Sequence, residues 1–272
     1  MMLHTPSLRD LSLETQGFYR QAVRLLHAAE VPFLVGGAYA LAHYTGIVRH
    51  TKDFDVFVRP AHARRALRAL ASGGFRCEIT FSHWLGKVFH GEDFVDVIFS
   101  SGNGMCKVDD DWFSHSAEAT FLGEPVRLCP AEEILWQKTF ICERERYDGA
   151  DVNHLLLARG PELDWGRLLR RFGTHWRVLL SHLVLFGYTY PSEREAVPAG
   201  VLEELTARLR DEAARPADAR RSVCRGTLLS RTQYAIDLEE WGFEDGRVSA
   251  GSMTADQAEV WTDAGLRQAR GA

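Results

Sequence analysis

Long apolar runs, closely spaced cysteines and an apolar leader are all missing from this sequence of 272 residues. No stretch of about 18 apolar residues occurs, which argues against a membrane-spanning helix. The first residues, MMLHTPSLRDLSLE, lack the basic start and apolar run of a signal peptide. The five cysteines are widely spaced and form no CxxC pair, so neither a zinc site nor a disulfide framework is indicated. We therefore expect a cytoplasmic protein with reduced thiols and no membrane partner.

Lysine is also scarce. Only four of the 32 basic residues are lysines, namely Lys52, Lys87, Lys107 and Lys138. Because arginine is the default cation of this chain, each lysine calls for a reason. The net charge of −5 and the pI near 6.1 argue against nucleic-acid binding through bulk positive charge, although they leave room for a local basic groove.

Strand and helix patterns alternate in the first half of the chain, and helix patterns dominate the rest. Residues 8–30 have helical apolar spacing that is interrupted near Gly17. Strand patterns occupy residues 31–37, 53–60, 75–81, 86–91 and 93–100, residues 101–116 are loop-like, and residues 121–130 predict a strand or a hairpin that turns at Gly123-Glu124. The patterns predict an α+β fold with one domain over residues 1–128 and a helical domain over residues 129–272.

Asp53 and Asp55 are two residues apart on an expected strand, so their side chains share one face, about 7 Å apart along the chain. Two such carboxylates repel each other unless a cation lies between them, and magnesium combines carboxylate ligands with water and phosphate oxygens. The alternative is a pair of acids on a solvated face. The apolar neighbours Phe54, Val56 and Phe57 indicate instead a buried strand, where spare charge is costly.

Gly36 and Gly37 end one expected strand and open the helix AYALAHYT. Backbone N–H groups at a helix start form an anion site, and glycines without Cβ atoms let a phosphate approach closely. The alternative is a tight turn that needs glycine for its backbone alone.

Asp96 is the only acid in the apolar run FVDVIF. A buried carboxylate without a partner is costly, and a metal ion or a strong hydrogen-bond donor is the usual remedy. The alternative is a core aspartate that is satisfied by the backbone or by an arginine.

Together these elements resemble the DNA polymerase beta-like nucleotidyltransferase superfamily. The shared pattern is a strand ending in two small residues, a short helix, a DxD on the next strand and a third aspartate on a later strand. Here it reads FLVGGAYALAHYTGIVRHTKDFDVFV followed by VDVIF. The Arg and Thr before the DxD are similar to the minimal and abortive-infection-toxin branches, and the pattern also resembles the aminoglycoside nucleotidyltransferases. The resemblance covers about 70 residues, extends weakly to Lys138, and implies a mixed β-sheet flanked by helices.

The resemblance implies a role for each matching residue. Gly36 and Gly37 would cradle the β- and γ-phosphates of a nucleoside triphosphate such as ATP. Asp53 and Asp55 would ligate two magnesium ions, or manganese ions in their place. Asp96 would bind the catalytic metal and help to deprotonate the acceptor hydroxyl. Where the family often has a serine this chain has Gly37, which removes one hydroxyl contact to phosphate.

Arg49 and Thr51 lie in the loop that leads into the DxD and match the Arg and the Ser or Thr of the toxin-like branch. Arg49 is expected either to meet a phosphate or to pair with an acid on the surface. Lys52 is next to Asp53 but is expected to point away from it, toward solvent.

Lys138 lies on the helix expected from Pro130 onward, among apolar neighbours. A lysine in such a place suits a point-charge contact to a triphosphate, and similar proteins carry a lysine on this helix. The alternative is an exposed or snorkelling lysine. Farther along, Asp148 and Asp151 are expected to orient Lys138 or Arg146, or to cap the next helix.

The predicted activity is the transfer of a nucleoside monophosphate from a nucleoside triphosphate to a hydroxyl, with release of pyrophosphate. The acceptor would be a protein side chain, a tRNA 3′ end or a small molecule, held by the helical residues 129–272, and a cognate antitoxin is a candidate partner. A non-catalytic module that binds a nucleotide or a partner is the alternative from another class, and the complete set of three aspartates speaks against it. A metal-dependent phosphohydrolase would leave Gly36-Gly37 unexplained.

Overall fold

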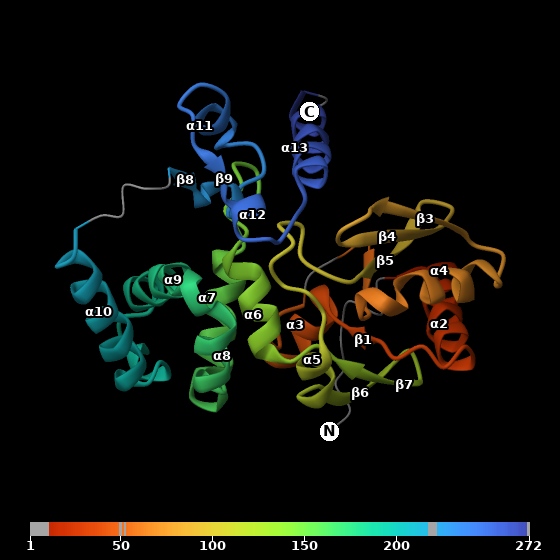
Figure 1. Ribbon diagram of the computed structural model, residues 1–272. Helices are drawn as coiled ribbons and strands as arrows, with labels where there is room; N and C mark the ends of the chain where they lie inside the picture. Colours follow the sequence, from red (N-terminus) through yellow and green to blue (C-terminus); the bar gives the residue numbers. More distant parts are fainter. Residues whose placement is uncertain (1–10, 49–50, 52, 217–221, 271–272) are drawn as a thin grey trace. The chain divides into compact units, whose positions relative to one another are not determined.

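The computed structural model describes residues 11–48, 51, 53–216 and 222–270, coloured along the chain in Figure 1. The chain divides into two compact units, Met1–Pro130 and Ala131–Ala272. The boundary between the units lies at the start of helix α6 (Ala131–Thr139), after the last strand of the large sheet.

The first unit is built on a seven-stranded sheet with the strand order β3-β4-β5-β2-β1-β7-β6. The strands are β1 (Leu34–Val35), β2 (Asp53–Phe57), β3 (Arg76–Phe81), β4 (Leu85–His90), β5 (Asp93–Ile98), β6 (Ala117–Phe121) and β7 (Glu124–Leu128). The pairs β2–β5 and β1–β7 are parallel, and the other pairs are antiparallel. The expected α+β class with a mixed sheet is therefore confirmed.

Helix α2 (Leu13–Ala28) runs without interruption, so the expected break near Gly17 is wrong. Its N-cap is Ser12, whose hydroxyl accepts a backbone N–H of the first turn at 3.0 Å. Gly17 faces solvent, and its cost of about 1 kcal/mol relative to alanine is outweighed by a buried apolar face that extends from Phe18 to Leu26. This helix packs against α4 (Ala63–Ala71) and the strands β5 and β7.

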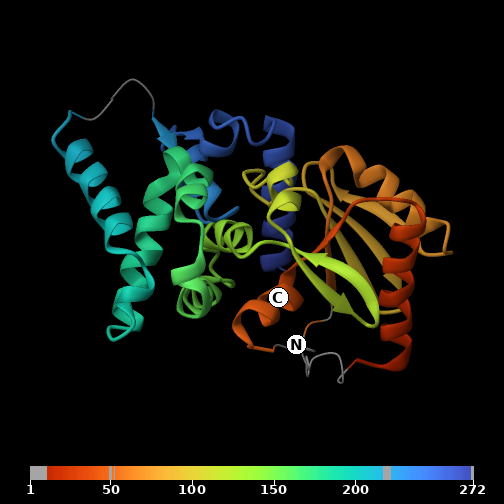
Figure 2. The ribbon, with the colours of Figure 1, turned by 90° about the horizontal axis from the view of Figure 1, so that it is seen from below.

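Two segments between β5 and the end of the sheet differ from expectation. A short helix, α5 (Asp110–Ser114), replaces part of the expected loop, because Asp109 accepts a hydrogen bond from the first turn at 3.1 Å and caps it. The hairpin of β6 and β7, yellow-green in Figure 2, turns at Leu122-Gly123 and not at Gly123-Glu124. Both turn residues have positive φ, 50° and 84°, as a tight hairpin turn requires.

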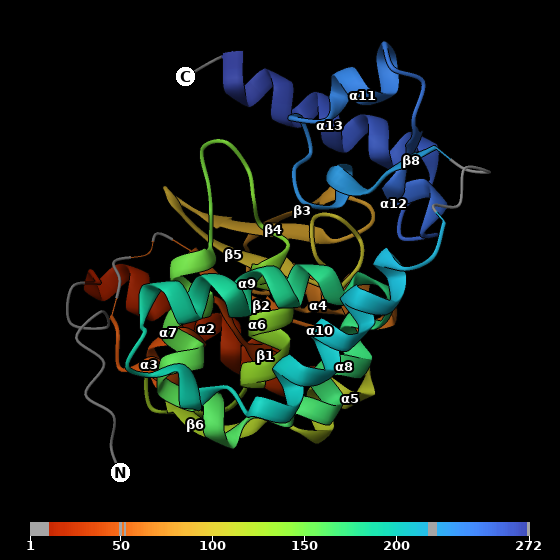
Figure 3. The same cartoon turned by 90° about the vertical axis from the view of Figure 1, so that its left-hand side faces the viewer.

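The second unit is mainly helical, with α6–α10 in green and cyan and the last helices in blue in Figure 3. Its remaining elements are α7 (Gly149–Arg159), α8 (Trp165–Phe172), α9 (Trp176–Thr189), α10 (Ala199–Ala213), β8 (Val223–Cys224), α11 (Ala235–Glu239), β9 (Glu244–Asp245), α12 (Gly246–Ser249) and α13 (Ala255–Arg270), with short 3-10 turns between them. The buried Arg167 of α8 pairs with Glu132 and with Glu133 of α6, each at 2.6 Å. Within the described residues, no helix combines the length and apolar character needed to cross a bilayer.

Candidate metal centre

Three carboxylates from two adjacent strands converge on one side of the sheet. The parallel pairing of β2 with β5 sets Asp55 directly beside Asp96. Asp53 lies two residues earlier on β2, on the same face as Asp55. One carboxylate oxygen from each of Asp53, Asp55 and Asp96 lies within 4.8 Å of those from the other two. The residues singled out from the sequence as metal ligands therefore meet in space.

Asp96 is the most deeply buried of the three, with 8% of the residue exposed. Burial raises the pKa of its carboxyl group, a hydrogen bond and the positive charge of Lys87 oppose that rise, and the charge of Asp53 adds to it. Lys87 lies directly opposite Asp96 on β4, and its Nζ donates to Asp96 Oδ1 at 2.7 Å. The same Nζ lies 3.9 Å from the centre of the Phe94 ring. Asp96 is thus a buried carboxylate that is paired with the ammonium group of Lys87.

Lys87 was not among the predicted site residues, although the sequence carried a signal for it. Strands β4 and β5 are joined by a two-residue turn at Gly91-Glu92, because His90 pairs with Asp93. Gly91 has a φ of +60°, which suits such a turn. In an antiparallel hairpin with this turn, each step back along β4 matches a step forward along β5, so residue 87 pairs with residue 96. Lys87 was also one of the four lysines to which the scarcity of that residue drew attention.

The turn of Gly36 and Gly37 begins helix α3 (Gly37–Thr45), and no side chain caps that helix. Gly37 has a φ of +54°, and a Cβ placed on it would lie 1.7 Å from Asp55 Oδ2. The Gly36 N–H donates to the carbonyl oxygen of Asp55 at 3.0 Å. The glycine turn therefore leaves room for the Asp55 carboxylate itself, and a serine at position 37 would collide with it. From the sequence, these glycines were expected either to let a phosphate approach or to form a tight turn, and their contact with Asp55 was not expected.

Thr51 precedes β2 and contacts Asp53. Its hydroxyl donates to the Asp53 carboxylate, and a longer contact of 3.3 Å reaches the Asp53 carbonyl oxygen. Thr51 therefore orients one carboxylate of the trio. Arg49 and Lys52 lie outside the described residues.

An aromatic layer supports β2 from the face opposite the carboxylates. The fully buried Phe54 stacks on Phe121 with ring centres 4.5 Å apart and on Tyr19 at 5.1 Å, and it meets Tyr39 edge-on at 5.8 Å. Burial, followed by nearby negative charge that includes Asp53, raises the pKa of Tyr39, so its phenol stays protonated. This packing makes β2 a rigid support for its two aspartates.

Lys138 belongs to the second unit, where carboxylates surround its ammonium group. Its Nζ donates to Asp148 and to Asp151, each at 2.7 Å. Arg146 makes two further hydrogen bonds to Asp148, both of 2.9 Å. Burial alone would raise the pKa of Asp148, but the hydrogen bonds from Arg146 and the charge of Lys138 lower it overall. Lys138 is neither solvent-exposed nor unpaired, and both aspartates contact it.

The three converging carboxylates fit a divalent metal ion. Their hard oxygen atoms are the ligands that magnesium and manganese prefer, and the strands hold them at a fixed spacing. Lys87 offsets one of the three negative charges, and a divalent cation bound between the carboxylates would relieve the repulsion that remains. Sites that bind two such cations about 4 Å apart catalyse displacements at phosphorus.

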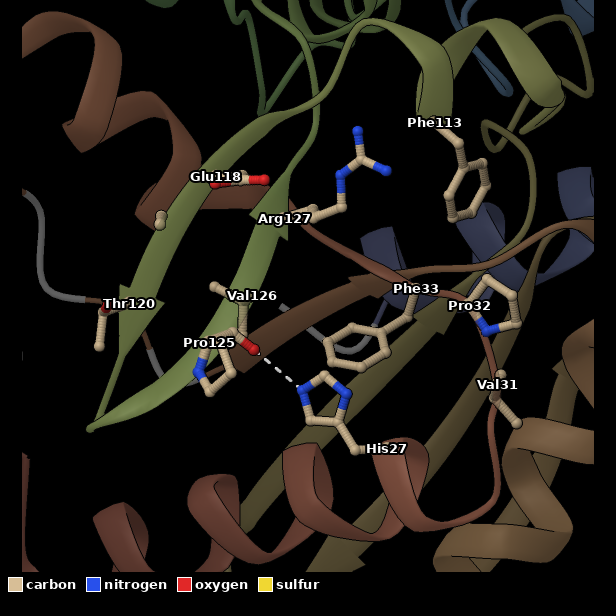
Figure 4. Close-up of a pocket in the computed structure, with 11 residues that line it drawn as sticks. His27, Val31, Pro32, Phe33, Phe113, Glu118, Thr120, Pro125, Val126 and Arg127 are labelled. Atoms are coloured by element: carbon tan, nitrogen blue, oxygen red, sulfur yellow. Dashed lines mark hydrogen bonds between the residues drawn. The ribbon is translucent and has the colours of Figure 1, made fainter.

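A cavity of about 670 Å³ lies elsewhere in the first unit. Figure 4 shows the rings of Phe33 and Phe113 and the guanidinium group of Arg127 around it, with His27 bonded to the Pro125 carbonyl oxygen at 2.9 Å. Its lining includes the segment just before β1, whereas the glycine turn follows β1. None of the three carboxylates lines this cavity.

No protein-family model matches the sequence, and no curated protein matches it. Solved structures similar to the chain include the antibiotic-resistance factor ANT(2'')-Ia, which is 17% identical over 75% of this chain and 95% of that one, with a TM-score of 0.39. The lincosamide antibiotic adenylyltransferase LnuA is 16% identical over 52% of this chain and 95% of its own, with a TM-score of 0.37. An antigenic nucleotidyltransferase-like protein from Paracoccidioides brasiliensis is 16% identical over 69% and 95%, with a TM-score of 0.40.

Proposed function

We propose that this protein is a magnesium-dependent nucleotidyltransferase, which transfers a nucleoside monophosphate from a nucleoside triphosphate to a hydroxyl and releases pyrophosphate. One observation carries the proposal: Asp53, Asp55 and Asp96 bring carboxylate oxygens to within 4.8 Å of one another beside a glycine turn that opens a helix. A phosphohydrolase could use the same carboxylates and would need the same glycine turn, because that turn makes room for Asp55, so transfer of the nucleotide to an acceptor is the property that separates the two activities.

The residues of the site would have separate roles in binding the metal ions and the phosphates. Asp53 and Asp55 would hold the two magnesium ions, with Thr51 orienting Asp53. The backbone at the uncapped start of α3, from Gly37 onward, would receive the phosphates, while Gly36, whose N–H donates to the Asp55 carbonyl oxygen, would shape the turn. When bound, the ions supply positive charge that stabilises the attacking and leaving oxygens.

In the proposed reaction the hydroxyl oxygen of the acceptor forms a bond to the α-phosphorus, and the bond from that phosphorus to the bridging oxygen breaks. The leaving group is pyrophosphate. The hydroxyl proton passes to the Asp96 carboxylate, one of the three converging groups. The acceptor is a protein side chain, a tRNA 3′ end or a small molecule.

Two measurements on the purified protein test this proposal. Calorimetry with each of the four nucleoside triphosphates should show binding that depends on magnesium. Incubation of the protein with a cell extract and an α-labelled triphosphate should then move label onto an acceptor and release pyrophosphate, and mass spectrometry of the labelled product identifies the acceptor. Asp53→Ala serves as the inactive control.

Other outcomes would point elsewhere. Binding of ADP alone, or no nucleotide binding, would favour a non-catalytic module. Release of inorganic phosphate without transfer of the labelled nucleotide would favour a phosphohydrolase.

A further inference from the structure

Lys87 is the one described side chain that hydrogen-bonds to Asp96. Its Nζ donates to Oδ1 at 2.7 Å across the β4–β5 pair, and Oδ2 takes no hydrogen bond from the residues that the structure describes. The lysine side chain is 23% exposed and the aspartate side chain 12%. This is therefore a largely desolvated ion pair between two neighbouring strands.

Several contacts restrain the lysine. Its backbone lies in the middle of β4, between two paired strands. Its ammonium group lies 3.9 Å from the centre of the Phe94 ring, a favourable cation–π distance. Both the backbone and the ammonium group of Lys87 are therefore restrained. A lysine restrained in this way can fix the orientation of the carboxylate that it contacts, which a mobile surface lysine could not do.

We propose that Lys87 is a positioning residue, which holds Asp96 by one oxygen so that the other is presented to the cations bound with Asp53 and Asp55. This inference rests on the proposed function of the same three carboxylates. It also has an electrostatic consequence. A positive charge next to the site repels a divalent cation, so Lys87 improves the geometry of Asp96 and weakens cation binding.

The two effects have opposite signs, which separates this role from a purely structural one. Loss of a strand-pairing contact alone would lower stability and would not strengthen cation binding. Loss of a positioning cation should tighten the binding of a divalent ion and at the same time slow turnover.

The test compares Lys87→Met, which keeps an unbranched side chain but removes the charge, with Lys87→Arg, which retains the charge. Lys107→Met is the matched control, because Lys107 is exposed and outside the site. Manganese binding is measured without nucleotide by calorimetry. Lys87→Met should bind manganese about fivefold more tightly, because one nearby like charge is worth about 1 kcal/mol. Its kcat should fall about tenfold, with the KM for the triphosphate little changed.

Lys87→Arg should restore much of the lost turnover, and Lys107→Met should match the parent protein in every assay. Lys87→Gln is the second neutral variant if the methionine variant does not fold. Unchanged manganese binding and turnover in the neutral variants would overturn the inference, as would weaker binding that merely follows a loss of thermal stability. If the parent protein transfers no nucleotide, the proposed function fails, and the manganese titration still tests Lys87.

Discussion

Replacing Asp53, Asp55 or Asp96 by asparagine is expected to lower kcat by about a thousandfold or more, which corresponds to about 4 kcal/mol of barrier. Asparagine keeps the shape of the side chain but removes the negative charge, so the trio loses one of its three anionic ligands. Single-turnover transfer from an α-labelled triphosphate measures the effect at saturating magnesium.

Asp110→Asn is the matched control for this set. The Asp110 side chain is 86% exposed and pairs with Arg59 at 2.6 Å, and Asp110 is not one of the three converging carboxylates. The control should keep the parent's rate. If a variant at one of the three positions kept a rate within tenfold of the parent, that carboxylate would have no part in holding the catalytic metal.

Gly37→Ala is expected to abolish most of the activity, with a loss of at least about a hundredfold, because a displaced group at a reacting centre commonly costs that much. Its Cβ would lie 1.7 Å from Asp55 Oδ2, so the carboxylate must move away from Asp53 and Asp96. Manganese affinity should fall together with the rate, because the carboxylates would no longer converge.

The control is Gly46→Ala, at the other end of the same helix. Gly46 also has a positive φ, of 72°, but nothing lies within 4 Å of a Cβ placed there. Both variants should lose about 1–2 kcal/mol of folding free energy to the backbone conformation. Only the variant at position 37 should lose activity and manganese binding. Equal activity in the two variants would contradict the role given to the glycine turn.

The shared face of Asp53 and Asp55 could be predicted from the sequence, because strand periodicity is a local property. The parallel pairing of β2 with β5 is different. Strands β3 and β4 intervene along the chain, so that pairing depends on the whole sheet. From the sequence, only the resemblance to a known family predicted that Asp96 lies beside Asp53 and Asp55.

Other features depend on contacts that local patterns do not encode. The need for Gly37 arises from the antiparallel pairing of β1 with β2, which puts the glycine turn beside Asp55. Helix α5 was missed because its start depends on the short cap at Asp109 and not on an apolar period. Lys87 could have been found, since a two-residue turn sets its register opposite Asp96. Asp148 and Asp151 were expected to orient Lys138 or Arg146, and both bond to Lys138, whereas the expected contact of Lys138 with a phosphate stays a prediction.

The most direct measurement of the central claim is the anomalous scattering of manganese in a crystal grown with a non-hydrolysable nucleoside triphosphate. We predict strong manganese peaks within ligand distance of Asp53, Asp55 and Asp96, with the triphosphate at the Gly36-Gly37 turn. Manganese and nucleotide bound elsewhere, with the three carboxylates free of metal, would contradict it.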